Sequence, residues 1–198
     1  MMDCAASPLD SNPCFPSSAT VTMSSGASVL IDTLKEGDSV LASTIDGVIT
    51  HDTVTLLSIA KPDATASFVS LSTSSNLTLS LTAGHHLPVG TTCCAQLKKA
   101  QDIKLGETVW TAQAGSIRPT VITNKLITHS KGLHSPVLMA GGFPIVDGFI
   151  TAFDSIDKVA LAKKGLSSIL TACQATGTCA LFRDLFFDKD GEYVTATH

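Results

Sequence analysis

Two segments of the chain repeat each other, and this repeat restricts what the chain can fold into. Residues 34–40 read LKEGDSV and residues 103–109 read IKLGETV, 69 positions apart, so a Gly precedes an acidic residue and a strand in both. A Gly-centred turn and a long β-prone run then follow each copy, with the turns at Asp46-Gly47 and Ala114-Gly115. We interpret the pair as a duplicated subdomain with pseudo-two-fold symmetry. The alternative is a coincidence of two turn-and-strand units.

Short β-branched runs, separated by Gly, Ser, Asn, Asp and Pro, fill the chain up to about residue 153. One of the separating turns is expected at residues 61–63, which read KPD. The runs predict strands at residues 21–23, 29–31, 39–42, 48–58, 67–71, 77–82, 108–112, 117–128 and in the apolar stretch after Ser135. This spacing leaves no room for the helices that connect parallel strands, so an all-β domain is expected. Hydrophobic residues make up 44% of the 198 and charged residues 15%, which predicts a packed core.

The most apolar stretch, residues 136–153, is interrupted by Gly141, Gly142, Pro144 and Asp147. It therefore favours buried strands over a membrane span. The N-terminus has neither the basic nor the apolar region of a secretory signal. The net charge is −4 and the basic residues are scattered, so nucleic acid is not expected as a partner.

The sequence changes character after Asp154. Apolar residues recur at approximate helical spacing between residues 158 and 173, and residues 181–187 form a second short apolar segment. These patterns predict a helical appendage. Its apolar side chains fit either packing on the β body or contact with a lipid surface.

Six cysteines stand at positions 4, 14, 93, 94, 173 and 179. Adjacent cysteines do not bridge easily, so we expect no disulfide between Cys93 and Cys94. Cys173 and Cys179 are candidates for a disulfide if the compartment is oxidising. The one approximation to a zinc site is the set His85, His86, Cys93 and Cys94, and it lacks the usual ligand spacing.

Two short segments hold residue types suited to covalent chemistry. Cys14 lies in NPCFP, directly before the first predicted strand, and LTAGH at residues 81–85 ends the alternating strand that leads into it. In this T-x-x-H pattern Thr82 closes the strand and His85 lies in the turn, so both can face one peptide bond. His is the usual proton donor near neutral pH. The alternatives are an incidental cysteine and a turn histidine with only a structural role.

Together these segments resemble the Hint (Hedgehog/intein) superfamily, most closely the Hedgehog C-terminal autoprocessing (Hog) domains, including Hog-like proteins of algae and protists. Five ordered blocks carry the resemblance, at residues 14–41, 81–89, 100–109, 132–136 and 145–152. The resemblance implies a horseshoe-like, pseudo-two-fold duplicated all-β Hint fold with a short helical C-terminal appendage. It implies three parts: an N-terminal flank at residues 1–13, an autoprocessing domain at residues 14–156 and an adduct-recognition-like appendage at residues 157–198.

The mechanism implied by the resemblance is an N-to-S acyl shift. Cys14 attacks the carbonyl of Pro13, His85 protonates the departing nitrogen of Cys14, and Thr82 orients the bond. The substrate is then the polypeptide fused in front, with no cofactor or metal, and a monomer is expected. The family resemblance suggests a secretory or extracellular setting.

Three departures from the family pattern bear on the reaction: one on the second step, one on the first step and one on a redox partner for Cys14. In Hog domains one polar residue activates the sterol hydroxyl, and the corresponding position here is Ile59, next to Ser58. His51 or Asp63 would take this position only if the alignment were shifted. Pro13 stands where Hedgehog proteins have Gly, and the late Cys of many Hog domains corresponds to Phe153. The missing activator makes sterol or another lipid a doubtful nucleophile, and hydrolysis or attack by another nucleophile stays open. Pro13 is expected to slow the first step, because its rigid φ limits strain at the scissile bond.

The C-terminus also lacks the residues used for splicing, so splicing is not expected. Two other functions stay open: an unreactive Hint-fold interaction scaffold, and a cysteine hydrolase acting in trans with Cys14 and His85.

Overall fold

The structure is a computed structural model, and it describes residues 13–152, 168, 171–173 and 175–178. Strands dominate this part of the chain, as expected. In chain order the elements are β1 (Thr20–Thr22), β2 (Ser28–Leu30), η1 (Ile31–Thr33), β3 (Ser39–Ser43), β4 (Ile49–Thr73), β5 (Thr78–Leu81), β6 (His86–Pro88), β7 (Leu97–Lys99), η2 (Ala100–Asp102), β8 (Thr108–Gln113), β9 (Ser116–Leu138), β10 (Phe143–Val146) and β11 (Phe149–Ile150).

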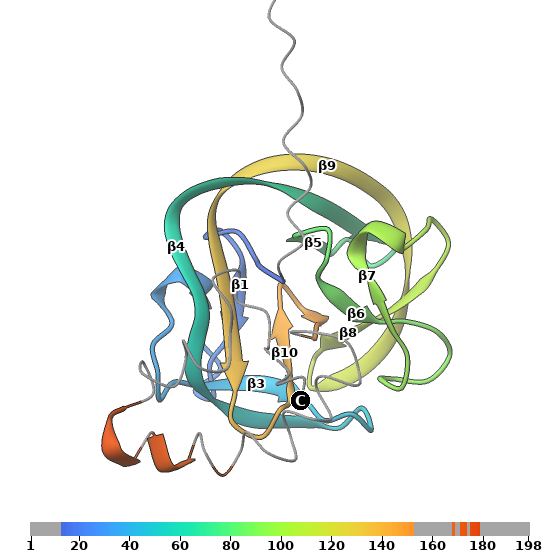
Figure 1. The fold of residues 1–198 in the computed structure, drawn as a ribbon. Helices are drawn as coiled ribbons and strands as arrows, with labels where there is room; N and C mark the ends of the chain where they lie inside the picture. The colour runs from blue at the N-terminus through green and yellow to red at the C-terminus, as the bar shows by residue number, and fades with distance from the viewer. Residues whose placement is uncertain (1–12, 153–167, 169–170, 174, 179–198) are drawn as a thin grey trace, which may run out of the picture.

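Two long strands organise the molecule. β4 spans 25 residues and β9 spans 23, and they pair antiparallel along most of their length. Figure 1 shows them as two arcs, side by side, that bend over the shorter strands. The turn expected at residues 61–63 is wrong, because β4 runs through it. Pro62 has no N–H to donate to the ladder, and the pairing register shifts between Lys61 and Thr65, where a bulge absorbs it.

The main sheet closes on itself. Its strands follow the order β11, β8, β9, β4, β3, β10, β1, β2, and β10 also pairs with β11. β5 adds to β4, and β6 and β7 form a separate hairpin. The apolar run after Ser135 supplies the end of β9 and both strands β10 and β11, so its interpretation as buried strands is confirmed.

The two repeat copies have the same local structure. In the first, Gly37 N–H donates to the Val54 carbonyl; in the second, Gly106 N–H donates to the Ile122 carbonyl, both at 2.8 Å. Both glycines have positive φ, 93° and 83°, which explains why Gly is required there. Each copy then enters a hairpin, β3–β4 or β8–β9. The predicted duplication is confirmed.

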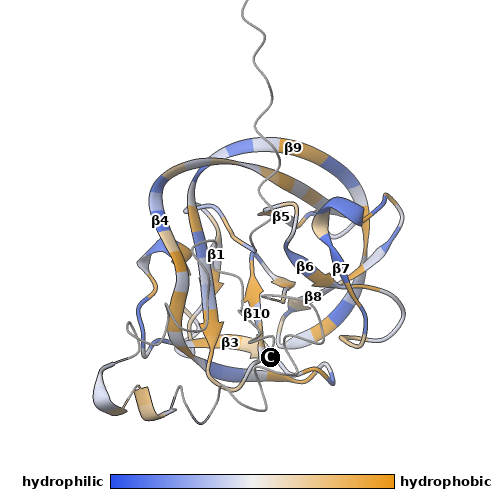
Figure 2. Cartoon of the chain, in the orientation of Figure 1, coloured by the Kyte–Doolittle hydropathy of each residue, from blue (hydrophilic) through white to orange (hydrophobic). Residues whose placement is uncertain are grey.

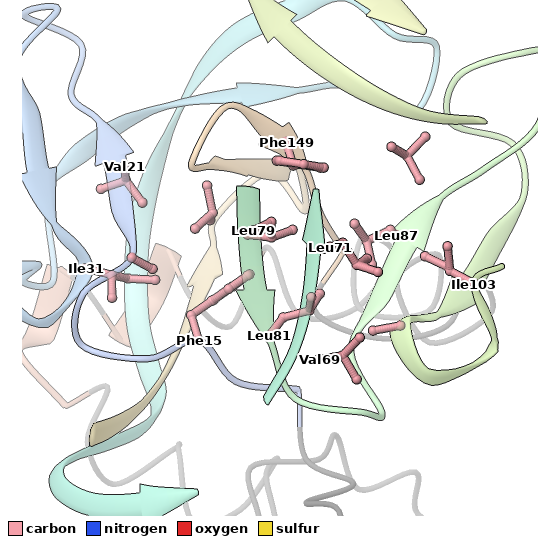
Figure 3. Close-up of a cluster of buried hydrophobic side chains, with 14 of the residues drawn as sticks. Phe15, Val21, Ile31, Val69, Leu71, Leu79, Leu81, Leu87, Ile103 and Phe149 are labelled. Atoms are coloured by element: carbon pink, nitrogen blue, oxygen red, sulfur yellow. The ribbon is translucent and has the colours of Figure 1, made fainter. Parts of the chain in front are cut away.

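Apolar side chains from both copies meet in the interior. The largest cluster combines Phe15, β1, the ends of β4, β5 and η2, and Figure 3 shows several of its side chains around Phe15, Leu79 and Leu81. Along β4 and β9 hydrophobic and hydrophilic segments alternate (Figure 2), while all four residues of β10 are buried. This core fixes the elements that carry the candidate site.

The expected helical appendage lies mostly outside the described residues; of those described, residues 168, 171–173 and 175–176 are helical. No helix within residues 13–152 and the short described pieces that follow is long and apolar enough to cross a membrane.

Candidate active site

Cys14 lies fully buried just before β1, between Pro13, which is also buried, and Phe15. Its side chain belongs to a small apolar cluster with Ile59, Phe68 and Leu133 from β4 and β9. The sequence placed Cys14 ahead of the first strand, and the structure gives it a buried setting between the long strands and the turn after β5.

Thr82 follows the last residue of β5. Leu79 and Leu81 point into the core and hold β5 against β4, which brings the strand end to Cys14. The Cys14 N–H donates to Thr82 Oγ1 at 2.9 Å, and this hydroxyl donates back to the Cys14 carbonyl at 3.3 Å. The Thr82 N–H donates to the same carbonyl at 2.9 Å. Thr82 therefore forms hydrogen bonds with both the N–H and the carbonyl of Cys14, and this N–H belongs to the Pro13–Cys14 peptide bond.

His85 closes the turn that begins at Thr82, its N–H donating to the Thr82 carbonyl at 3.1 Å. The start of η2 holds this turn from the other side, since Ala100 N–H donates to the His85 carbonyl at 2.7 Å. The ring packs on Phe15, with 4.2 Å between centroids. The T-x-x-H pattern thus brings Thr82 and His85 together beside Cys14.

The His85 ring is 1% exposed, and neither ring nitrogen has a hydrogen-bond partner among the described residues. Burial and, to a lesser extent, the neighbouring His86 lower the pKa of His85 to about 3, although the backbone of Cys14 acts in the opposite direction. The imidazole is therefore neutral near pH 7 and can accept a proton. Buried nitrogens without partners are costly and point to a functional role.

The positions expected to activate the second nucleophile are occupied by unreactive groups. Ile59 is 4% exposed and belongs to the same small apolar cluster as Cys14. The Ser58 hydroxyl donates to the Ser135 carbonyl at 3.1 Å. Of the alternatives, His51 is exposed opposite Leu41 and Asp63 is exposed in an ion pair with Lys131.

Sequence reasoning missed Ser17 and His134. Ser17 Oγ and His134 Nε2 are 2.8 Å apart, and the backbone of His134 pairs with Phe15, next to Cys14. His134 lies inside the fourth resembling block, residues 132–136, but at a position to which the family pattern assigns no residue type. The pairing depends on chain segments far apart in sequence, so no local signal predicts it.

The expectation for Cys93 and Cys94 is wrong. A disulfide joins them, and their Cα atoms lie 3.1 Å apart. Within the described residues no group of three or more His, Cys, Asp or Glu side chains is placed to hold a metal ion. Cys173 is buried and disulfide-bonded; Cys179 and Phe153 lie outside the described residues.

Comparison with known proteins identifies a protein family whose members this chain resembles. Residues 2–184 match the family described as Hint module. A curated relative is the Tiggy-winkle hedgehog protein of Danio rerio, 32% identical over 143 residues. The match takes in 69% of this chain and 34% of that protein, so the chain spans about a third of this relative's length.

Solved structures with a similar fold are inteins. The DnaB intein from Synechocystis sp. PCC 6803 gives a TM-score of 0.62 at 14% identity and covers 71% of this chain and 98% of its own. The Ssp DnaB mini-intein variant M86 gives 0.63 at 15% identity, covering 75% and 99%. At these identities the likeness shows the fold, and it confirms the fold expected from the sequence.

Proposed function

The chain belongs to the Hint module family, and we propose that it is a Hedgehog-type autoprocessing domain that cleaves the peptide bond before Cys14. The observation that carries the proposal is the 2.9 Å hydrogen bond from the Cys14 N–H to Thr82 Oγ1 in a buried site. It fixes the nitrogen that must leave. The domain would be residues 14–156 of a monomer, with the polypeptide ahead of Cys14 as its substrate and residues 157–198 as its appendage.

The first step converts an amide into a thioester. The thiol proton of Cys14 passes to the neutral imidazole of His85, and the thiolate attacks the carbonyl carbon of Pro13. The C–N bond then breaks, and the proton passes from His85 to the Cys14 nitrogen, which leaves as an amine. The protons balance, and no cofactor takes part.

Burial makes His85 suited above all to the second half of this transfer, the protonation of the leaving nitrogen. With a pKa of about 3, the ring is free of a proton before the reaction. Once protonated in the same desolvated site it is a strong acid, so it passes the proton on to a poor leaving group. Thr82 keeps the leaving nitrogen oriented throughout.

The second step releases the thioester by water or another nucleophile. Ile59 gives a hydroxyl nucleophile no base at the position where Hog domains carry one. This favours hydrolysis or a small reactive nucleophile over sterol transfer.

A second candidate function is an unreactive Hint-fold interaction scaffold. The buried Pro13 favours it, because its rigid φ limits how far the scissile bond can be strained. A cysteine hydrolase acting in trans is disfavoured, because Cys14 and His85 are 0% and 1% exposed.

A reporter fused ahead of residue 1 separates these functions. Dithiothreitol or hydroxylamine is added, and cleavage is followed by gel and mass spectrometry. Autoprocessing predicts release at the Pro13–Cys14 bond, none in Cys14→Ala, and release slowed at least about tenfold in His85→Ala. Hydroxylamine does not reduce disulfides, so it distinguishes thioester cleavage from reduction of the Cys93–Cys94 bridge. No release from the unmodified chain over days supports the scaffold, and a sterol arm shows whether lipid is joined.

A further inference from the structure

The segment after Cys14 is held by a short strip of β9, residues 131–134. Phe15 and His134 exchange two backbone hydrogen bonds, of 2.9 and 3.0 Å. The Ser17 N–H donates to the Lys131 carbonyl at 2.9 Å. The strip therefore docks the chain on the C-terminal side of the nucleophile, where Thr82 does not reach.

A side-chain contact completes this docking. Ser17 Oγ and His134 Nε2 form a hydrogen bond of 2.8 Å, with His134 buried and Ser17 half-buried. We propose that Ser17 and His134 form a positioning lock that sets the geometry of Cys14 for the acyl shift, an inference that rests on the proposed function. Neither residue touches the reacting atoms; both act through the segment they hold.

Gly132 shows that the strip is shaped around Ser17. A Cβ added at Gly132 would lie 2.1 Å from Ser17 Oγ and 2.7 Å from its backbone nitrogen, closer than any side chain permits. Gly132 also has φ +89°, a conformation that other residues rarely adopt. The close approach of the two segments therefore requires Gly at this position.

The surroundings of His134 suit a lock. Burial lowers its pKa, and the exposed carboxylate of Asp32 in η1 acts in the opposite direction. A neutral imidazole carries one donor and one acceptor nitrogen, so it matches a serine hydroxyl in either tautomer. His134 can hold Ser17 without a charge beside the apolar cluster around Cys14.

The lock also connects to the proton-transfer residue. Phe15, fixed between the Cys14 backbone and its pairing with His134, packs its ring on His85 at 4.2 Å. A displacement of the docked segment would move both the nucleophile and the ring that supports His85. Misplacement by about 1 Å costs on the order of a hundredfold in rate in well-oriented reactions, so a modest loosening is measurable.

The test uses the full chain with its reporter and measures the rate of hydroxylamine-induced release and the urea unfolding midpoint. Ser17→Ala and His134→Phe should each slow release by about tenfold, the effect of losing one oriented hydrogen bond. The double variant should be no slower than the slower single variant, because both changes remove the same bond. His134→Gln, whose carboxamide can reach Ser17, should restore release to within about twofold of the unmodified chain.

A second Ser–His pair provides the matched control. Ser67 Oγ on β4 and His129 Nε2 on β9 lie 3.1 Å apart, so this pair shares β9 with the lock but does not hold the segment after Cys14. Ser67→Ala and His129→Phe should leave the release rate unchanged at similar stability. Equal slowing in the control pair, additive effects in the lock pair, or unchanged rates in Ser17→Ala and His134→Phe would each overturn the lock.

Hydrogen exchange separates failure of the lock from failure of the proposed function. If the unmodified chain never releases its reporter, the autoprocessing proposal fails, but the amides of Phe15 and Ser17 still report docking. Faster exchange at these amides in His134→Phe, and not in His129→Phe, would support the lock on its own. Unchanged exchange would overturn it.

Discussion

At the scale of single residues, His85 and His134 flank the segment that carries Cys14, and burial lowers the pKa of both. They differ in their partners. His134 Nε2 binds Ser17, whereas neither nitrogen of His85 has a partner in the described part of the chain. Leaving buried nitrogens without hydrogen bonds costs stability, and a reactive group must keep them available. This contrast is why proton transfer is assigned to His85 and positioning to His134.

Removing the hydroxyl of Thr82 tests its grip on the leaving nitrogen. Thr82→Val keeps the shape of the side chain but leaves the buried Cys14 N–H without its acceptor, which costs about 1–3 kcal/mol of folding free energy. The acyl shift should slow by at least about tenfold. Thr82→Ser, which retains the hydroxyl, is the matched control and should keep most of the rate.

Hydroxylamine-induced release gives the rate for these variants, and urea unfolding gives the stability. Release from Thr82→Val at the unmodified rate would remove Thr82 from the mechanism. Loss of stability with an unchanged rate would make its role purely structural.

The residues that sequence reasoning found share one property: their roles follow from local structure. Thr82 closes a strand and His85 lies in the turn that follows, so their proximity is fixed within four positions. The role of His134 depends on Ser17, 117 positions away, and on which strand lies beside the nucleophile. No pattern near residue 134 contains that information.

At the scale of elements, η2 supports the turn that contains His85. Gln101 N–H donates to the Ala83 carbonyl, and Ala100 N–H to that of His85. Lys125 on β9 in turn donates its Nζ to the carbonyls of Gln101 and Ile103, at 2.6 and 2.8 Å. β9 therefore stabilises η2, and through it the turn, with a single charged side chain.

Lys125→Met should loosen this support. The carbonyls of Gln101 and Ile103 lose a charged donor, which is worth about 1.5–3 kcal/mol where the bonds are shielded and less where water replaces it. Reporter release should slow several-fold, because His85 is less well held. Lys35→Met is the control: it replaces an exposed lysine in the first repeat copy, and should change stability by less than about 0.5 kcal/mol and leave release unchanged.

The rate of reporter release and the thermal unfolding midpoint, measured for both variants, show whether Lys125 positions His85 through η2. An equal effect of both substitutions on release would mean that η2 does not position His85.

The elements also show where sequence patterns fail. Residues 48–58 and 67–71 were predicted as separate strands, with a turn at Lys61-Pro62-Asp63 between them. They form one strand because β9 offers a partner along almost the whole length. Pairing over that distance overrides a local turn preference, and Pro62 is tolerated at a bulge. The repeat was predictable because its turn chemistry is local and occurs twice.

At the scale of the whole molecule, the closed sheet keeps the site dry. Core side chains from both repeat copies surround Phe15, while Cys14 belongs to its own small cluster against β4 and β9. The same burial that gives His85 its reactivity must therefore appear in the stability of the fold. Every histidine that is kept neutral by folding makes stability depend on pH.

The sign of this dependence follows from the direction of the shift. The pKa of His85 is about 3 in the folded chain and near its ordinary value of 6.5 in the unfolded chain. Between these values the unfolded state binds more protons, so the free energy of unfolding is greatest above pH 6.5 and falls as the pH decreases. One such histidine costs about 2 kcal/mol between pH 7.5 and pH 5, and His134, whose pKa is also lowered, adds to the loss.

Urea unfolding at pH 7.5 and pH 5 measures this loss directly. In His85→Gln about 2 kcal/mol of the pH dependence should disappear, whatever the substitution does to stability at pH 7.5. Asp147, whose pKa is raised by burial, acts in the opposite direction in both proteins and cancels in the comparison. When His134→Gln is added to His85→Gln, the loss of unfolding free energy between pH 7.5 and pH 5 should decrease again, by a smaller amount. If His85→Gln loses as much stability as the unmodified chain, then His85 is protonated in the folded state at pH 5, and the neutral proton acceptor that the acyl shift requires is absent there.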